Sequence, residues 1–183
     1  TIQSRGLGDV YKRQDKFDLN KLVLVGETAE ASLRRTSEIL RDQGLNPNVT
    51  IEFISKEQGV FSGYGEISQI ISRFLPKAFR DEVLCLNDGD IFAKGEVILR
   101  LSCTFAVIAN YITAINGIIS SSSGWATAAK ECVDSAEGIP IVNFGAPHVH
   151  PNVVGTMDYS SIQGGAKGCL LYTSDAADDC WSV

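Results

Sequence analysis

The chain has 183 residues, of which 44% are hydrophobic and 21% charged, and its formal net charge at pH 7 is −6. This composition is typical of a globular protein and excludes a disordered or collagen-like one. Acidic and basic residues are interspersed, which argues against a nucleic-acid groove, because such a groove needs a basic stripe. The longest apolar stretch, 105–119, is interrupted by Asn110 and Asn116 and is shorter than the roughly 18 residues of a membrane span. We therefore expect neither nucleic acid nor membrane as a partner.

The cysteines predict a reduced compartment. They show no CxxC spacing and no even framework, and the N-terminus lacks the apolar core of a signal peptide. A cytoplasmic location fits both features. The five positions are Cys85, Cys103, Cys132, Cys169 and Cys180.

Both ends of the sequence resemble translated sequencing adapters. Codons can be chosen for residues 9–14 and 169–174 that are reverse complements of each other over almost their whole length. The alternative is a loose N-terminal arm and an acidic tail. We expect 1–14 and 169–183 to be adapter-derived rather than native, and we interpret 15–168 as a protein fragment open at both ends.

The first part of the chain predicts a small lobe of helices and strands. The spacing of apolar residues, together with the glycines and prolines that end the elements, sets their limits. In chain order we expect a short strand or an edge of lost sequence at 22–25, a helix at 28–43 capped by Thr28 and ended by Gly44, a strand at 49–54, a glycine-rich turn at 59–65, a helix at 66–75, and strands at 82–86 and 96–103 joined by the turn 87–90.

The second part is more apolar and predicts an α/β arrangement. A helix is expected at 104–116, with a second helix or its continuation at 117–136. Small side chains in the serine run 120–124 would let helices or a ligand approach closely. Pro140 to Phe144 is a short apolar strand of the parallel-sheet kind. Chemistry in such folds lies just beyond the C-terminal end of a strand, which here is the segment 145–151.

That segment contains both histidines of the chain, His148 and His150. A metal interpretation needs at least one more ligand, and Asp158 is the only nearby carboxylate. The alternatives are loop histidines bonded to backbone, or a role in a substrate site such as contact with phosphate or ribose hydroxyls. The three interpretations remain open at this point.

A second candidate is the glycine-rich run 164–168, which contains Lys167. Glycines let backbone N–H groups face a phosphate, and a lysine adds a positive charge. The run lacks the GK[ST] ending of a Walker A motif, so an ordinary turn is the alternative. A possible strand at 159–163 before the run favours the phosphate interpretation. Cys132 and Trp125 are interpreted as core residues.

Residues 34–168 resemble the nicotinate phosphoribosyltransferase family, a branch of the type II phosphoribosyltransferases that also includes the quinolinate and nicotinamide enzymes. The order and spacing of several blocks match. They are Ser121 to Lys130, Gly138 to Ala146, His148 to Pro151, Tyr159 and Gly164 to Ala166, with looser matches at 35–50 and 88–100.

The resemblance implies an α/β fold, with an N-terminal lobe over 15–103 followed by the helices and first strands of an incomplete TIM-like barrel over 104–168. It implies that nicotinate and phosphoribosyl pyrophosphate are joined to give nicotinate mononucleotide and pyrophosphate, with ATP hydrolysis and Mg²⁺, in a cytoplasmic homodimer. It assigns substrate binding to five residues but no catalytic residue and no metal ligand. Phe144 would stack on the pyridine ring, with Gly145 and His148 beside it, and Gly164 and Gly165 would border the ribose or phosphate.

Two positions depart from the family pattern. Pro147 stands where an arginine is usual, and the expected tyrosine near Ser32 is absent. An arginine can hold a carboxylate or phosphate by charge-assisted hydrogen bonds, which proline cannot. A sister enzyme of the nicotinamide or quinolinate type, or a non-catalytic α/β binding domain, are therefore the alternatives. By resemblance, the histidine that couples ATP hydrolysis would lie beyond residue 168.

Overall fold

The computed structural model describes residues 19–75 and 83–170. The predicted adapter-derived segment 1–14 lies outside the described residues, as does all of 169–183 except Cys169 and Leu170. The elements have the following bounds: α2 Lys21–Leu24, α3 Ala31–Asp42, β1 Asn48–Ile54, β2 Gly59–Val60, α4 Tyr64–Phe74, β3 Leu84–Cys85, β4 Ile91–Phe92, β5 Val97–Thr104, α6 Phe105–Ile108, α7 Ile112–Ser135, β6 Val142–Asn143, η1 Ala146–His148, η2 Pro151–Val153, α8 Val154–Gln163 and β7 Gly168–Cys169.

The N-terminal lobe is built on an antiparallel sheet with the order β1-β5-β3. β-Branched and aromatic residues alternate along β1, which pairs with β5 over its whole length, with Ile51 opposite Leu101. Leu99 and Leu101 are fully buried on the inner face of the sheet. A separate antiparallel pair, β2 and β4, extends the lobe toward the second unit.

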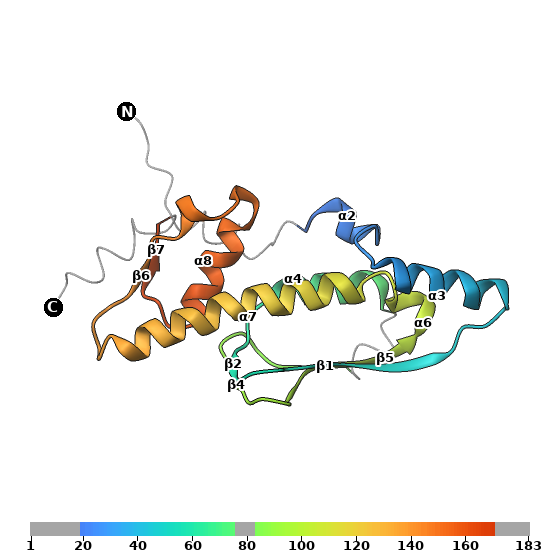
Figure 1. Cartoon of the computed structure of the whole chain (residues 1–183), viewed down its shortest axis with the longest axis horizontal. Helices are drawn as coiled ribbons and strands as arrows, with labels where there is room; N and C mark the ends of the chain where they lie inside the picture. Colours follow the sequence, from blue (N-terminus) through green and yellow to red (C-terminus); the bar gives the residue numbers. More distant parts are fainter. Residues whose placement is uncertain (1–18, 76–82, 171–183) are drawn as a thin grey trace.

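Helices α4 and α7 cover one face of this sheet (Figure 1). In α4 the buried residues Ile67, Ile70 and Ile71 recur at helical spacing, so one stripe of the helix enters the core. The rings of Phe74 and Tyr111 stack with their centroids 4.6 Å apart beside this layer. The core of the lobe therefore lies between the sheet and these helices.

Helix α7 is the longest helix described and links the lobe to a second unit (Figure 1). The serine run 120–124 does not interrupt it; the break falls at 109–111, after the short helix α6. Ser122, Ser123 and Ala126 are buried on the side of α7 that faces its neighbours. The segment that approaches the serine run is the loop before α4, where the Ser62 N–H donates to Ser123 Oγ at 3.2 Å, and the end of α8 approaches α7 at Ala126, just beyond the run.

The second unit is a strand–helix–strand motif at the far end of α7. Strands β6 and β7 are parallel, with Val142 opposite Gly168, and α8 connects them. This arrangement confirms the predicted class, an N-terminal α/β lobe followed by the start of a parallel α/β unit. Cys169 is fully buried in β7, so the ordered structure continues into the first residue predicted to be adapter-derived.

Several local predictions were wrong. Cys132, predicted as a core residue, is exposed on α7. Residues 22–25 form the end of α2, whose start is capped by the Asn20 side chain, rather than a strand. Thr28 does not cap the next helix, which starts at Ala31 without a side-chain cap. Residues 159–163 are the end of α8, not a strand, because Met157, Ser160 and Ser161 are buried at helical spacing.

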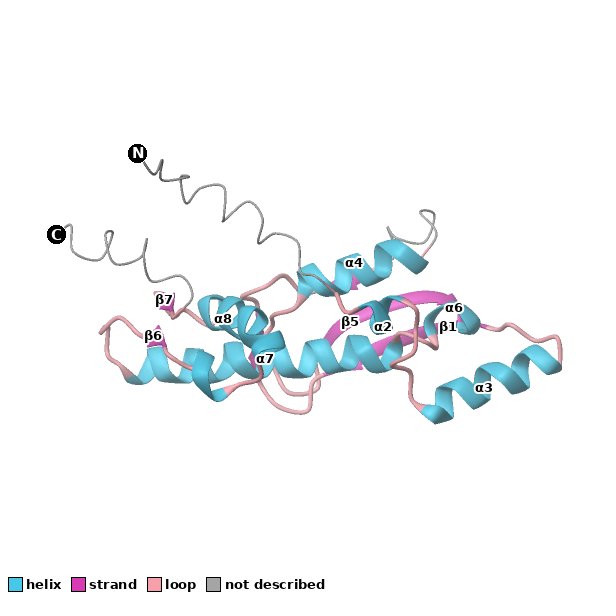
Figure 2. Ribbon diagram, turned by 90° about the horizontal axis from the view of Figure 1, so that it is seen from above, coloured by secondary structure: helices cyan, strands magenta, loops and turns pink. Residues whose placement is uncertain are grey.

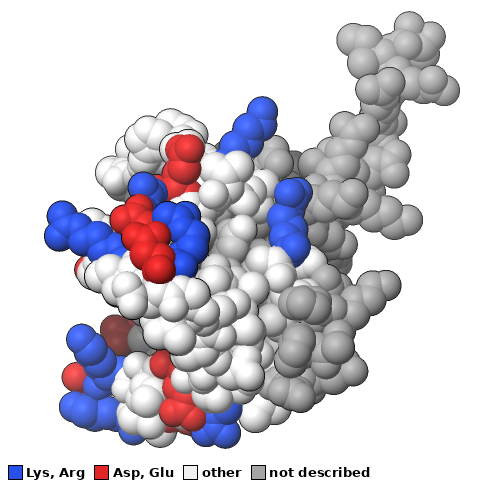
Figure 3. Space-filling model, turned by 90° about the vertical axis from the view of Figure 1, so that its right-hand side faces the viewer, with Lys and Arg blue, Asp and Glu red and all other residues white. Residues whose placement is uncertain are grey.

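Helix α3 lies at the end of the molecule remote from α8, to the side of α7 (Figure 2). The predicted stop at Gly44 is confirmed: Gly44 has φ +67, and the N–H groups of Gly44 and Leu45 donate to the carbonyls of Arg41 and Leu40, as in a Schellman motif. The face at this end of the molecule mixes basic and acidic side chains (Figure 3). This face therefore offers no single-sign stripe.

Candidate functional site

The predicted ligand loop follows β6 at the C-terminal end of the parallel pair. Phe144, directly after β6, is 62% exposed. His148, at the end of η1, is also exposed. Both residues thus lie on one short loop whose side chains are accessible, at the edge where α/β folds place their ligands.

The side chain of Asn143 anchors this loop. Its Oδ1 accepts a hydrogen bond from the Gly145 N–H at 2.8 Å, and its Nδ2 donates to Asp158 Oδ1 at 3.1 Å and to Ser161 Oγ at 3.0 Å. Asp158 and Ser161 are buried one turn apart on α8. Asn143 was not among the site residues predicted from the sequence; the signal for it was the order Asn-x-Gly at a strand end, which favours an Asx turn.

Gly145 packs closely against neighbouring side chains. A Cβ there would lie 2.9 Å from Asn143 Oδ1 and 3.0 Å from Met157 Sδ. Both atoms are the ends of side chains, so a larger residue there would displace the Asn143 and Met157 side chains. This packing and the hydrogen bonds of Asn143 therefore fix the position of the loop backbone at Gly145, the residue after Phe144.

His150 serves the local backbone. Its Nδ1 accepts a hydrogen bond from the Asn152 N–H at 3.2 Å, which caps η2. Within residues 19–75 and 83–170, no group of three or more His, Cys, Asp or Glu side chains is placed to hold a metal ion. The geometry thus favours the backbone interpretation for His150 and leaves His148 as the free histidine of the pair.

The glycine-rich run 164–168 ends α8. Gly165 has φ +101, and the N–H groups of Gly165 and Ala166 donate to the carbonyls of Ile162 and Ser161, which is a Schellman motif. The N–H groups of Gly164 and Lys167 donate to the Ser160 and Ile141 carbonyls. The N–H groups of 164–167 are therefore all used within the protein, and the predicted role of Gly164 and Gly165 beside ribose or phosphate gains no support from them.

Helix α8 also fixes the second unit to the N-terminal lobe. The Tyr159 hydroxyl donates to Asp88 Oδ2 at 2.9 Å, and Asp88 Oδ1 accepts from the N–H groups of Gly63 and Tyr64 at the start of α4. The hydroxyls of Ser62 and Ser160 lie 3.1 Å apart in a buried contact. One turn of α8 thus carries both the loop contacts and the lobe contacts.

A hollow of about 620 Å³ lies between α2, α4, α7 and the segment 152–156. Trp125 and Glu66 both line it, so Trp125 is half-buried at a surface rather than enclosed in the core. Burial raises the pKa of the Glu66 carboxyl, and the nearby Asp88 carboxylate raises it further. Phe144 and His148 do not line this hollow.

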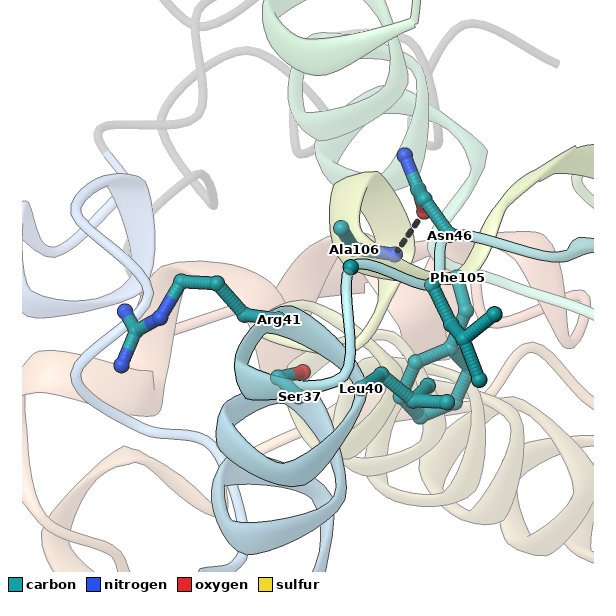
Figure 4. A pocket seen from close by; sticks show the side chains of 8 residues that line it. Ser37, Leu40, Arg41, Asn46, Phe105 and Ala106 are labelled. Atoms are coloured by element: carbon teal, nitrogen blue, oxygen red, sulfur yellow. Dashed lines mark hydrogen bonds between the residues drawn. The ribbon is translucent and has the colours of Figure 1, made fainter.

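Two smaller hollows lie in the lobe. One of about 270 Å³ separates the end of α3 from the start of α6; the Ala106 N–H donates to Asn46 Oδ1 across it, while the Arg41 side chain points away (Figure 4). The other, of about 260 Å³, is lined by Cys85 beside α4. Burial, with a smaller contribution from Asp88, raises the pKa of the Cys85 thiol to about 12. A thiol with that pKa is a poor nucleophile at neutral pH.

Comparison with known families identifies the class of this fold. The model of the quinolinate phosphoribosyl transferase N-terminal domain matches residues 32–123, which is half of the chain. The chain therefore belongs to the quinolinate phosphoribosyl transferase family. Sequence resemblance placed it in the wider group of type II phosphoribosyltransferases correctly, but the matching model is that of the quinolinate branch rather than the nicotinate branch.

Solved structures with the same fold are nicotinate-nucleotide pyrophosphorylases. The protein from Pyrococcus furiosus has a TM-score of 0.73 at 24% identity, with 84% of this chain and 40% of that chain covered. The protein from Francisella tularensis has a TM-score of 0.62 at 16% identity, with 78% of this chain and 54% of that chain covered. The protein from Ehrlichia chaffeensis has a TM-score of 0.59 at 18% identity, with 91% of this chain and 55% of that chain covered. The chain spans about half the length of these relatives or less, and at this identity the likeness shows the fold alone.

A comparison with curated proteins finds no match. Among the described helices, none combines the length and apolar character that crossing a bilayer requires.

Proposed function

We propose that this chain is the N-terminal part of a phosphoribosyltransferase that makes nicotinate mononucleotide from a pyridine carboxylate and phosphoribosyl pyrophosphate, in NAD biosynthesis. The observation that carries the proposal is the exposed Phe144–His148 loop at the C-terminal end of β6, in a chain of this family. An aromatic face beside a histidine suits a planar, anionic ring.

In this reaction the bond between ribose C1 and the pyrophosphate oxygen breaks, and a bond from C1 to the pyridine nitrogen forms. Charge develops on the ribose ring in the transition state, so the protein contributes chiefly by positioning the ring and the departing pyrophosphate. Phe144 would stack on the ring, while His148 would donate a hydrogen bond to its carboxylate. The described residues hold no cluster that fits a dedicated Mg²⁺ site, so we assign no metal ligand here.

Quinolinate is the first candidate for the pyridine substrate, because the family model carries that name. Quinolinate has one carboxylate more than nicotinate and must lose it as CO₂ to give the same product. The loop 145–151 contains no lysine or arginine, and Pro147 stands at the position where the resemblance leads us to expect an arginine. The charges that neutralise a second carboxylate would therefore come from residues outside this loop.

Nicotinate is the second candidate. The family model ends at residue 123, before the loop, whereas the resemblance to nicotinate phosphoribosyltransferases includes Phe144 to Ala146 and His148 to Pro151. The segment that would contact the base therefore lies outside the matched residues. ATP coupling and a homodimer belong to this second candidate as proposals.

The deciding experiment uses the full-length protein encoded by the uninterrupted reading frame around residues 15–168. It is incubated with phosphoribosyl pyrophosphate, Mg²⁺ and either quinolinate or nicotinate, with and without ATP, and nicotinate mononucleotide and CO₂ are measured. CO₂ release from quinolinate would support the first candidate, and ATP-stimulated turnover of nicotinate the second. Turnover of nicotinamide alone, or of no pyridine, would refute both.

A variant ties the activity to the loop. Phe144→Ala is expected to raise the KM for the pyridine substrate at least tenfold, because the stacking surface is lost. Ile39→Ala is the matched control, since Ile39 is 63% exposed on α3, at the end of the molecule remote from the loop. An unchanged KM in Phe144→Ala would show that the ring binds elsewhere.

A further inference from the structure

We infer that Asn143 is a positioning residue for the pyridine site: its amide group holds the Phe144–His148 loop in place on α8. The inference rests on the proposed function, because it concerns the same loop. It adds a residue that does not contact substrate and acts through the backbone of Gly145.

The hydrogen bonds of Asn143 tie three segments together. Its Oδ1 accepts a hydrogen bond from the Gly145 N–H at 2.8 Å. Its Nδ2 donates to Asp158 Oδ1 and Ser161 Oγ on α8 at 3.1 and 3.0 Å. An amide suits this place because one side accepts while the other donates twice. No other residue type combines an acceptor and two donors on so short a side chain.

The anchor on the α8 side is rigid. Asp158 is fully buried, and the Ser161 hydroxyl donates to the Met157 carbonyl at 2.9 Å. The neighbouring residues Tyr159 and Ser160 bond to Asp88 and Ser62 of the lobe. One turn of α8 therefore holds the loop in a fixed position relative to the N-terminal lobe.

The contact with Asp158 gives the inference a distinctive test. In Asn143→Asp, the Gly145 N–H can still donate to the new side chain. The Ser161 hydroxyl loses the donor that Asn143 Nδ2 supplied, because its own proton is donated to the Met157 carbonyl, and two carboxylates then face each other about 3.1 Å apart. Two such groups cannot both be charged at low cost, so the pair holds a proton at neutral pH or separates. At lower pH the shared proton restores a hydrogen bond between them.

The experiment measures steady-state kinetics of the full-length protein between pH 5.5 and 8.5. We expect Asn143→Ala to raise the KM for the pyridine substrate at least tenfold while the KM for phosphoribosyl pyrophosphate changes less than twofold. In Asn143→Asp, kcat/KM relative to wild type should rise at least fivefold from pH 8 to pH 6. Asn116→Asp, on the exposed side of α7, makes the same chemical change and should show neither effect.

Equal increases in both KM values, or a flat pH ratio for Asn143→Asp, would overturn the positioning role. Should the wild-type protein turn over no pyridine substrate, the proposed function fails by itself. The anchor is then judged by amide hydrogen exchange at Gly145: faster exchange in Asn143→Ala than in Asn116→Asp supports it, and equal exchange refutes it.

Discussion

Single atoms decide which glycines of this chain can be replaced. Gly164 has an ordinary backbone conformation, but a Cβ there would overlap the Ala126 carbonyl oxygen and lie 2.8 Å from the Ala129 Cβ. Helix α7 and the end of α8 are in backbone contact at this point. The glycine is therefore required by packing rather than by a left-handed conformation.

Gly164→Ala is expected to lower the free energy of unfolding by about 1–3 kcal/mol, because the added methyl group must push the two helices apart. Gly124→Ala is the control: it lies within α7 with nothing within 4 Å of its Cβ position, and should stabilise by about 0.5–1 kcal/mol. Urea unfolding of the full-length protein measures both. Equal effects of the two substitutions would contradict the packing argument.

The Glu66 carboxyl makes stability depend on pH. Its pKa is raised above the ordinary value of 4.5, first by burial and then by Asp88, so the folded protein binds this proton more tightly than the unfolded chain. The stabilising contribution is present below the ordinary pKa and is lost as the pH rises through the raised pKa. Deprotonation of Glu66 thus opposes folding at neutral pH.

We expect Glu66→Gln to equal wild type in stability at acidic pH and to become progressively more stable than wild type as the pH rises above 4.5. Unfolding curves at several pH values measure the difference. Glu131→Gln, on the exposed side of α7, serves as the control. A constant difference between Glu66→Gln and wild type across the pH range would show that burial does not disfavour the charge.

At the scale of elements, α7 holds the lobe and the second unit together through small side chains. Ser123 Oγ accepts the Ser62 N–H at 3.2 Å, and Thr127 Oγ1 accepts the Val60 N–H at 3.0 Å. Both bonds satisfy backbone N–H groups of the segment 60–62, which packs against α7. The Ser122 hydroxyl, fully buried one residue earlier, has no hydrogen-bond partner among the described residues.

Adjacent serines should therefore respond in opposite directions. Ser123→Ala leaves the buried Ser62 N–H without its acceptor and should cost about 1–3 kcal/mol of stability. Ser122→Ala removes an unsatisfied hydroxyl and should be neutral or stabilising by about 1 kcal/mol. Thermal unfolding of the two variants tests this, and destabilisation by Ser122→Ala comparable to that by Ser123→Ala would refute it.

The sequence predicted elements well where an apolar stripe faces one core. In α4, Ile67, Ile70 and Ile71 repeat at helical spacing and are all buried. It failed at α8, where the buried side includes Asp158, Ser160 and Ser161. Polar residues become buried there because partners distant in sequence, such as Asn143 and Ser62, satisfy them, and periodicity of hydrophobic residues cannot show such partners.

The candidate site was predicted in part for the same reason. Phe144 and His148 stand on a loop that the strand–loop pattern placed correctly, but their anchor, Asn143, depends on contacts with a helix that was predicted as a strand. The glycine run 164–168 looked like a phosphate loop because glycine frequency does not reveal where N–H groups point. In the structure they complete the end of α8.

At the scale of the whole molecule, the second unit exposes apolar surface that a barrel would cover. Ile139, Phe144, Val142 and Leu170 are 70%, 62%, 39% and 39% exposed around the β6–β7 pair. Two strands form a short parallel sheet with open edges, which favours pairing between molecules. The structural relatives are longer than this chain, which covers 40% of the Pyrococcus furiosus protein and 55% of the Ehrlichia chaffeensis protein.

We therefore expect the 183-residue chain on its own to aggregate and to lack phosphoribosyltransferase activity, because most of the barrel that would enclose Phe144 is missing. Light scattering after size-exclusion chromatography and an assay for nicotinate mononucleotide measure both properties. The matched control joins residues 19–170, which keep β7 whole, to the part of the Pyrococcus furiosus relative that lies beyond the region matched by this chain. We expect this chimera to be soluble and monodisperse. A monodisperse, active 183-residue chain would contradict the prediction, since it would show that the β6–β7 pair needs no further strands to form a working site.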